Sequence, residues 1–168
     1  MDLQANHRVG FGYDVHRFTR GRRLVLGGVR IPYPLGLEGH SDADVLLHAI
    51  ADAVLGAAAL GDIGMHFPNT SKKYKNISSL KLMREVRALL RAKGAGVVNI
   101  DSTVVLEEPK LSRHVPSMRR KIATALGIPS AAVSVKATTS EGLGFAGRRE
   151  GCAAFAIALI AVHPPKKR

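Results

Sequence analysis

With 168 residues, 46% of them apolar, the chain is long enough for one domain with a sizeable core, and its lone cysteine excludes an internal disulfide or a cysteine-based zinc cage. The N-terminus lacks the regions of a signal peptide and the apolar stretch 152–162 is too short to cross a membrane, so we expect a cytoplasmic protein without a membrane partner. The net charge of +12 leaves open a solvated basic surface, a nucleic-acid partner or a phosphate-rich ligand.

The first elements in chain order are predicted to be strands. An apolar, glycine-containing run predicts a strand at 7–15. Short apolar runs at 22–26 and 29–31 predict a strand or hairpin pair, because Gly27 and Gly28 break them. Residues two apart in such strands point to the same side.

A long helix is predicted over 41–60, and its body is apolar on nearly every side, so it should be buried. Ser41 and Asp44 fit a capping box at its start. Asp44, His48 and Asp52 are four residues apart and form one polar line on this helix. Polar groups on a buried helix need partners, which a metal and the groups around it would supply.

The rest of the chain predicts alternating helices and strands. We expect a loop at 61–75, an amphipathic helix at 79–93, a strand at 97–106, a helix at 115–126, a strand at 133–137, a glycine-rich loop at 138–148 and a buried strand at 150–162. This order predicts an α+β sandwich with helices on one face of the sheet. We expect a single domain over 1–168, with its core at about 7–162 and a disordered tail at 163–168.

Asp14, His16 and His48 form the clearest chemical pattern. Asp14 and His16 share one side of the predicted first strand, and His48 on the helix could close a third side. Two imidazoles and a carboxylate with a fourth place open are the ligand set of a catalytic zinc. Ordinary core or surface histidines remain the alternative, because most Asp-x-His pairs bind no metal.

Three further segments suit an anionic ligand. His40 and Ser41 precede the long helix, where free amides could bind an anion, although a simple turn is equally consistent. Segment 138–151 combines hydroxyls, glycines and arginines, which suit phosphate oxygens, and its Glu141 could hold Mg²⁺ or Mn²⁺ beside a diphosphate. A flexible surface loop is the alternative there. Asp62 could bind ligand hydroxyls or merely turn the chain.

Six motifs occur in an order that indicates a known family. They are Gly12-Tyr-Asp-Val-His-Arg-Phe18, Gly27-Gly-Val-Arg-Ile-Pro32, Gly39-His-Ser-Asp-Ala-Asp-Val45, Leu60-Gly-Asp-Ile-Gly64, Val135-Lys-Ala-Thr-Thr139 and Gly142-Leu-Gly-Phe145. With these motifs the chain resembles the 2-C-methyl-D-erythritol 2,4-cyclodiphosphate synthase family of the non-mevalonate isoprenoid pathway. The resemblance runs from about residue 9 to residue 160.

The resemblance implies a ferredoxin-like α+β sandwich with a four-stranded main sheet, assembled as a homotrimer with active sites between subunits. It also implies a reaction: metal-assisted intramolecular phosphoryl transfer in 4-diphosphocytidyl-2-C-methyl-D-erythritol 2-phosphate, which gives the 2,4-cyclodiphosphate and CMP. The nucleophile then belongs to the substrate, so the enzyme needs no activated serine or cysteine. No nucleic-acid partner is implied.

The same resemblance implies residue roles. Zinc would bind to Asp14, His16 and His48, and a second divalent cation, Mg²⁺ or Mn²⁺, to Glu141. His40 and Thr139 would be catalytic and stabilise the transition state. The implied substrate-binding positions are Asp14, Val15, His16, His40, Ser41, Asp62, Ile63, Gly64, Phe67, Pro68, Asn69, Thr70, Ser71, Leu106, Glu107, Glu108, Pro109, Lys110, Leu111, Ser112, Thr138, Thr139, Ser140, Glu141, Phe145 and Arg148.

The chain departs from the family pattern at a few positions. Asn69 and Ser71 stand where the family often has two carboxylates, and Arg149 stands where it often has glycine. Two competing hypotheses remain. A zinc phosphohydrolase that activates a water would use the same metal ligands, and an RNA-binding module would stack bases on Phe11, Tyr13 and Phe18.

Overall fold

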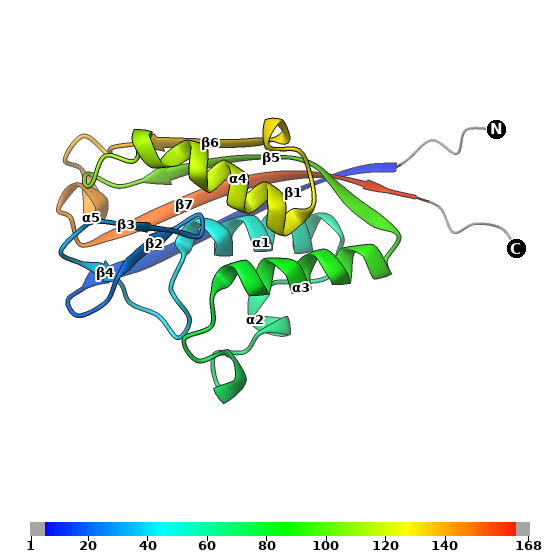
Figure 1. The fold of residues 1–168 in the computed structure, drawn as a ribbon, viewed down its shortest axis with the longest axis horizontal. Coiled ribbons are helices and arrows are strands. Elements are labelled where there is room, and N and C mark those ends of the chain that lie inside the picture. The colour runs from blue at the N-terminus through cyan, green and yellow to red at the C-terminus, as the bar shows by residue number, and fades with distance from the viewer. Residues whose placement is uncertain (1–5, 164–168) are drawn as a thin grey trace, which may run out of the picture.

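The computed structural model describes residues 6–163, which form a mixed five-stranded sheet and a small hairpin with helices packed beside them (Figure 1). The strands are β1 (Asn6–Thr19), β2 (Leu24–Leu26), β3 (Val29–Ile31), β4 (Gly36–Leu37), β5 (Ala95–Val105), β6 (Val133–Thr138) and β7 (Gly151–Val162). The helices are α1 (Val45–Ala57), α2 (Ile63–His66), α3 (Ser79–Ala92), α4 (Val115–Leu126) and α5 (Gly144–Gly147), with 3₁₀ turns at Lys72–Tyr74, Ser112–His114 and Ser130–Ala132. Residues 164–168 of the expected tail lie outside the described part.

The strand order in the main sheet is β4-β1-β7-β5-β6, and β5 and β6 are its parallel pair. The α+β class is therefore confirmed, and β2 and β3 pair as the predicted hairpin. The expected four-stranded main sheet is wrong by one strand. Strand β1 continues to Thr19, beyond its predicted end at residue 15, and its last residues pair with the two-residue strand β4. A strand of two residues carries no alternation from which it could be predicted.

Helix α1 is shorter at both ends than the predicted helix at 41–60. Ala43 has a φ of 56° and Ala59 a φ of 53°, and these left-handed residues interrupt the helical path on either side. The capping box is also wrong. Asp44 caps the helix by accepting from the Leu47 N–H at 3.1 Å, and Ser41 Oγ instead accepts from the Ala43 N–H at 3.1 Å.

The contact between β1 and α1 is unusually close. A Cβ placed on Gly10 would lie 2.0 Å from the Ala53 carbonyl oxygen, and one placed on Gly12 would lie 1.9 Å from the Ala49 carbonyl oxygen. The two glycines therefore let the helix backbone rest directly on the strand. This approach sets the position of every side chain that α1 directs toward β1.

One face of the sheet carries the core. Alternate residues of β7 from Cys152 to Ile160 are buried under the helices, and α1 contacts both β1 and β7. Cys152 is core filling, as expected. Among residues 6–163, the opposite face exposes apolar side chains of β1 and β7: Val9, Phe11, Tyr13, Val15, Phe155 and Ile157.

The remaining connections hold short elements that the sequence did not predict. The loop expected at 61–75 contains α2, and the glycine-rich loop expected at 138–148 contains α5. Within residues 6–163, none of the helices combines the length and the apolar character needed to span a membrane.

Candidate metal centre and ligand cavities

Asp14, His16 and His48 converge as predicted. The Asp14 Oδ2 atom lies 2.9 Å from His16 Nε2 and 2.9 Å from His48 Nδ1, and the two imidazole nitrogens are 3.2 Å apart. Each side chain is partly buried, with 13–24% of its surface exposed. One ligand atom from each residue thus lies within 4.8 Å of the other two, and His16 and His48 also line an adjoining cavity. This donor set of two nitrogens and one oxygen fits a divalent zinc with a free coordination position.

The electrostatics of the trio favour a cation. Burial alone would raise the pKa of Asp14, but hydrogen bonds from His16 and His48 and their charges outweigh it and lower the pKa to about 2. The carboxylate is therefore ionised at neutral pH. Burial alone would lower the pKa of His48. The hydrogen bond to Asp14 and the charge of Asp14 outweigh burial, so the pKa of His48 lies above its usual value.

The other two acids on the helix line have different partners from those expected. Asp44 is fully buried and accepts from the backbone N–H groups of Gly27 at 2.9 Å and Gly28 at 2.6 Å, besides Leu47. Asp52 accepts from the Ile63 N–H at 2.7 Å. Asp44 thus anchors the β2–β3 hairpin, and Asp52 anchors the turn before α2. Neither belongs to the metal-ligand trio, so the prediction that the whole line serves a metal is wrong.

A cavity of about 490 Å³ adjoins the trio. Its lining includes His16, His48 and the following residues expected to bind substrate: His40, Ser41, Ile63, Gly64, Phe67, Pro68, Asn69 and Thr70. Gly39, Tyr74, Ile77 and Leu82 also line this cavity and are not among the predicted residues. Asp62 lies at its side and caps α2 by accepting from the Met65 N–H at 2.9 Å. Polar and aromatic groups surround the open side of the metal centre.

Arg22 fixes the wall of this cavity, and sequence reasoning missed it. Its guanidinium donates to the Gly39 carbonyl at 2.8 Å and to the Ser41 carbonyl. His40 Nε2 lies 3.1 Å from the Ser71 carbonyl, so the imidazole ties the segment to the loop of the altered family motif. The carbonyls that Arg22 holds lie about 20 residues away in sequence, and no local pattern relates them.

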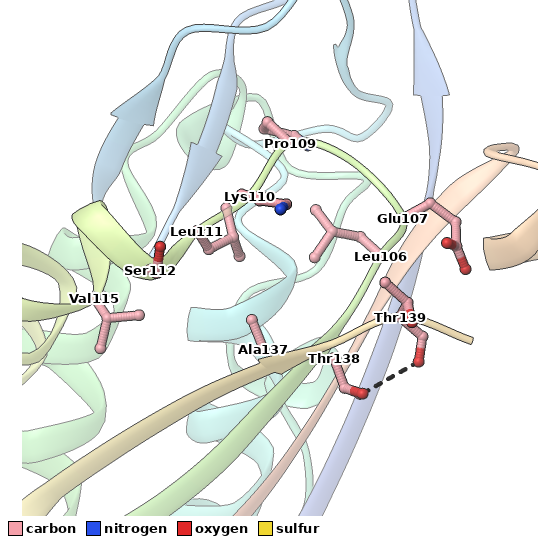
Figure 2. Close-up of a pocket in the computed structure, with 10 residues that line it drawn as sticks. All are labelled: Leu106, Glu107, Pro109, Lys110, Leu111, Ser112, Val115, Ala137, Thr138 and Thr139. Atoms are coloured by element: carbon pink, nitrogen blue, oxygen red, sulfur yellow. Dashed lines mark hydrogen bonds between the residues drawn. The ribbon is translucent and has the colours of Figure 1, made fainter. Parts of the chain in front are cut away.

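A second cavity of about 450 Å³ lies at the other end of the predicted site (Figure 2). Figure 2 shows the segment after β5 on one side and the end of β6 on the other. The lining residues are Leu106, Glu107, Pro109, Lys110, Leu111, Ser112, Val115, Ala137, Thr138 and Thr139. The mostly apolar walls with a few hydroxyls suit a planar base. Val115 and Ala137 were not predicted here.

The glycine-rich segment is ordered by Glu107 beside this cavity. One oxygen of Glu107 accepts from the Ser140 N–H at 2.9 Å, the Ser140 hydroxyl at 3.1 Å and the Gly142 N–H at 3.3 Å. Thr139 donates its hydroxyl to Glu141 at 2.7 Å. The expected catalytic threonine and the expected ligand of the second cation are thus neighbours. A single exposed carboxylate fits Mg²⁺, which keeps waters and takes further oxygens from substrate phosphates.

The structure leaves some predicted residues apart from both cavities. The two linings share no residue: His16, His40 and His48 line one cavity, and Thr139 lines the other. The predicted residues outside both linings are Asp14, Val15, Asp62, Ser71, Glu108, Ser140, Glu141, Phe145 and Arg148. Arg148 pairs with Glu150 at 2.9 Å, and Glu108 with Arg149 at 3.0 Å. Phe145 is an exposed residue of α5.

Fold and site together define a class: an α+β protein with a candidate metal site of two histidines and one aspartate beside cavities that suit a nucleotide and phosphates. The chain belongs to the YgbB family, whose sequence model matches residues 7–161. The enzyme named 2-C-methyl-D-erythritol 2,4-cyclodiphosphate synthase from Syntrophomonas wolfei is 63% identical over 153 residues, which are 91% of this chain and 98% of that protein.

Solved structures agree with this membership. The bifunctional IspDF from Campylobacter jejuni has a TM-score of 0.91 at 42% identity, over 95% of this chain and 43% of that longer chain. The IspF CDP complex from Plasmodium falciparum has a TM-score of 0.82 at 32% identity, over 95% of this chain and 99% of that one. The resemblance seen in the sequence motifs is therefore confirmed at the level of the family.

Proposed function

We propose that this chain is a 2-C-methyl-D-erythritol 2,4-cyclodiphosphate synthase, a phosphorus-oxygen lyase. It converts 4-diphosphocytidyl-2-C-methyl-D-erythritol 2-phosphate to the cyclic diphosphate and CMP in the non-mevalonate pathway. The observation that carries the proposal is the open trio of Asp14, His16 and His48 beside a polar cavity, in a member of a family whose curated relatives bear this name.

The obstacle to this reaction is the repulsion between two anionic phosphates. Asp14, His16 and His48 would hold zinc, and Glu141 with substrate oxygens would hold Mg²⁺ or Mn²⁺. Bound there, such cations would neutralise phosphate charge and act as Lewis acids. The chain itself would bind and orient the 2-phosphate so that it attacks the β-phosphorus, while CMP leaves. Orientation of this kind can supply about 7–11 kcal/mol in favourable cases.

The two cavities suggest a division of labour. The cavity of 450 Å³ would take the cytidine, in keeping with the CDP complex of the Plasmodium falciparum relative. The cavity beside the trio would take the erythritol and its phosphates. His40 and Thr139 would donate hydrogen bonds to phosphate oxygens in the transition state. The remaining predicted binding residues stand as proposals on the same grounds.

A homotrimer with sites between subunits would join the two half-sites. The support is twofold. Within one chain the two cavities have no lining residue in common, and the face of the sheet opposite the core exposes a contiguous aromatic group in which the rings of Tyr13 and Phe155 are 5.0 Å apart. An exposed apolar face of this kind is typical of subunit contacts. Light scattering should give the mass of three chains, and a monomer would contradict this assembly.

We also propose a cytoplasmic location, which suits the free Cys152.

The function is tested by incubating the chain with the cytidine-diphospho substrate, with and without a chelator, and following products by phosphorus NMR. The expected result is CMP and a cyclic diphosphate in equal amounts, with turnover lost in chelator. The second candidate, a zinc phosphohydrolase, is favoured by the open coordination position alone. It would release orthophosphate or a linear product, and that outcome would refute the cyclisation.

A further inference from the structure

We propose that Asp42 and Ser79 are positioning residues for the candidate metal centre: through a hydrogen-bonded chain they keep a proton on the Nε2 atom of His48 and so make Nδ1 the ring nitrogen that binds a cation. This inference rests on the metal site of the proposed function but names two residues that are neither among the predicted site residues nor in the lining of either cavity. It follows from which atoms can donate and which can only accept.

The chain of contacts begins at the ring of His48. Its Nδ1 faces Asp14, and its Nε2 lies 3.0 Å from the Ser79 hydroxyl and 3.2 Å from the Ser41 hydroxyl. Ser79 is 1% exposed, so no solvent competes for its hydroxyl. Asp42 accepts both from that hydroxyl and, at 2.9 Å, from the Ser79 backbone N–H.

The direction of each hydrogen bond is fixed by the carboxylate. An ionised Asp42 can only accept, so the proton of the Ser79 hydroxyl points to Asp42. The hydroxyl then offers a lone pair to His48, and Nε2 must donate to it. Nδ1 donates to the Asp14 carboxylate in this structure. Because one ring nitrogen of a metal-bound imidazole carries the proton and the other binds the metal, an Nε2 that keeps its proton makes Nδ1 the nitrogen that would exchange its proton for a cation.

The same contacts also join two elements, so a purely structural role is the alternative. Asp42 precedes α1, Ser79 begins α3, and the Asp42 N–H donates to the Ile77 carbonyl at 3.1 Å. A structural tie would affect the stability of the metal-free protein. A positioning role would affect zinc affinity even where the metal-free protein is stable.

Asp42→Asn separates the two roles because an amide of the same shape has one oxygen where the carboxylate has two. If that oxygen accepts from the Ser79 N–H, the amide nitrogen donates to the Ser79 hydroxyl. The hydroxyl proton then turns toward His48, and Nε2 becomes an acceptor. Nδ1 must carry the proton, which blocks it as a ligand.

The experiment measures zinc affinity of the metal-free full chain by competition with a chromophoric chelator, together with its thermal unfolding. We expect Asp42→Asn and Ser79→Ala each to weaken zinc binding by about 10–100-fold. Ser79→Thr, which keeps the hydroxyl, should restore affinity. Ser78→Ala is the matched control, because Ser78 is adjacent but makes no side-chain capping bond. Its zinc affinity should equal that of the wild type.

Zinc affinities of Asp42→Asn and Ser79→Ala within twofold of the wild type would overturn the inference, whatever their melting temperatures. If Ser79→Ala fails to fold, Asp42→Asn alone decides. The proposed function fails separately: a wild-type chain that binds zinc but forms no cyclic diphosphate would refute the reaction and leave the positioning role standing.

Discussion

Replacing Gly12 by alanine tests whether the strand–helix contact sets the metal geometry. The added Cβ would lie 1.9 Å from the Ala49 carbonyl oxygen and 2.7 Å from the Ala53 nitrogen, where ordinary contact begins at 3.4 Å. Both obstacles are backbone, so strand and helix must separate by about 1.5 Å, the difference between 3.4 and 1.9 Å. Overpacking of this kind costs about 1–3 kcal/mol, and we expect the upper end because no side chain can yield.

The separation should also weaken zinc binding. His48 is next to Ala49 on α1, whereas Asp14 and His16 are on β1, so the displacement would act directly between ligands. Metal–ligand distances tolerate only about 0.2 Å. Gly10→Ala meets an equally close obstacle farther along the helix and should cost similar stability with less effect on zinc. The pair of variants thus separates loss of packing from loss of ligand geometry.

The assay is urea unfolding of the metal-free protein, followed by zinc competition on the folded variants. Gly56→Ala is the control on the same helix: nothing lies within 4 Å of its added Cβ, and we expect a gain of about 0.5–1 kcal/mol. A Gly12→Ala protein whose free energy of unfolding lies within about 0.5 kcal/mol of the wild type would refute the reasoning.

Three further predictions concern other parts of the site. His48→Ala should lower CMP release at least about 100-fold without changing the oligomeric mass by light scattering, since a bound cation is worth several kcal/mol to the transition state; full activity of this variant would exclude the trio. Burial and the charge of Asp42 raise the pKa of Asp44 from 3.8 to about 6, so the folded state binds this proton more tightly than the unfolded state. Stability from this group should therefore fall as the pH rises from about 4 to about 6, and Asp44→Asn, compared by urea unfolding in chelator, should show a flatter dependence; equal slopes would contradict it. Glu107→Ala should raise KM several-fold with a smaller effect on kcat, because the segment containing Ser140 and Gly142 loses its acceptor; an unchanged KM would show that the segment is ordered without it.

The sequence predicted the periodic elements well because each carries its own signal. Helix α4 has the bounds predicted from the sequence, and α3 ends one residue earlier than predicted, because apolar residues recur at helical spacing in both. The predicted ends of α1 are wrong because Ala43 and Ala59 adopt left-handed conformations. Alanine is a helix-forming residue, so its presence does not predict such a conformation. Strand β4 was missed because two residues contain no pattern.

The candidate site divides in the same way. Asp14 and His16 could be paired from spacing alone, since strand geometry is local. The partners of Asp44 and Asp52 could not, because those carboxylates bind backbone N–H groups of distant segments, and a backbone N–H has no sequence signature. Ser79 is hidden for the same reason: 37 residues separate it from the Asp42 carboxylate that orients it.

The candidate metal centre and the close packing of α1 on β1 depend on the same two glycines of β1. Gly10 and Gly12 occupy the same side of β1 as Asp14 and His16, because side chains alternate along a strand. At Gly10 and Gly12 this side of β1 has no side chain, and the backbone of α1 rests directly on the strand. Farther along β1, the side chain of Asp14 extends toward α1 and contacts His48. His48 lies next to Ala49, the residue that covers Gly12, and therefore meets Asp14 two residues beyond. The glycines thus bring the third ligand within reach of the first two, so selection for metal binding would also constrain positions that never touch the metal.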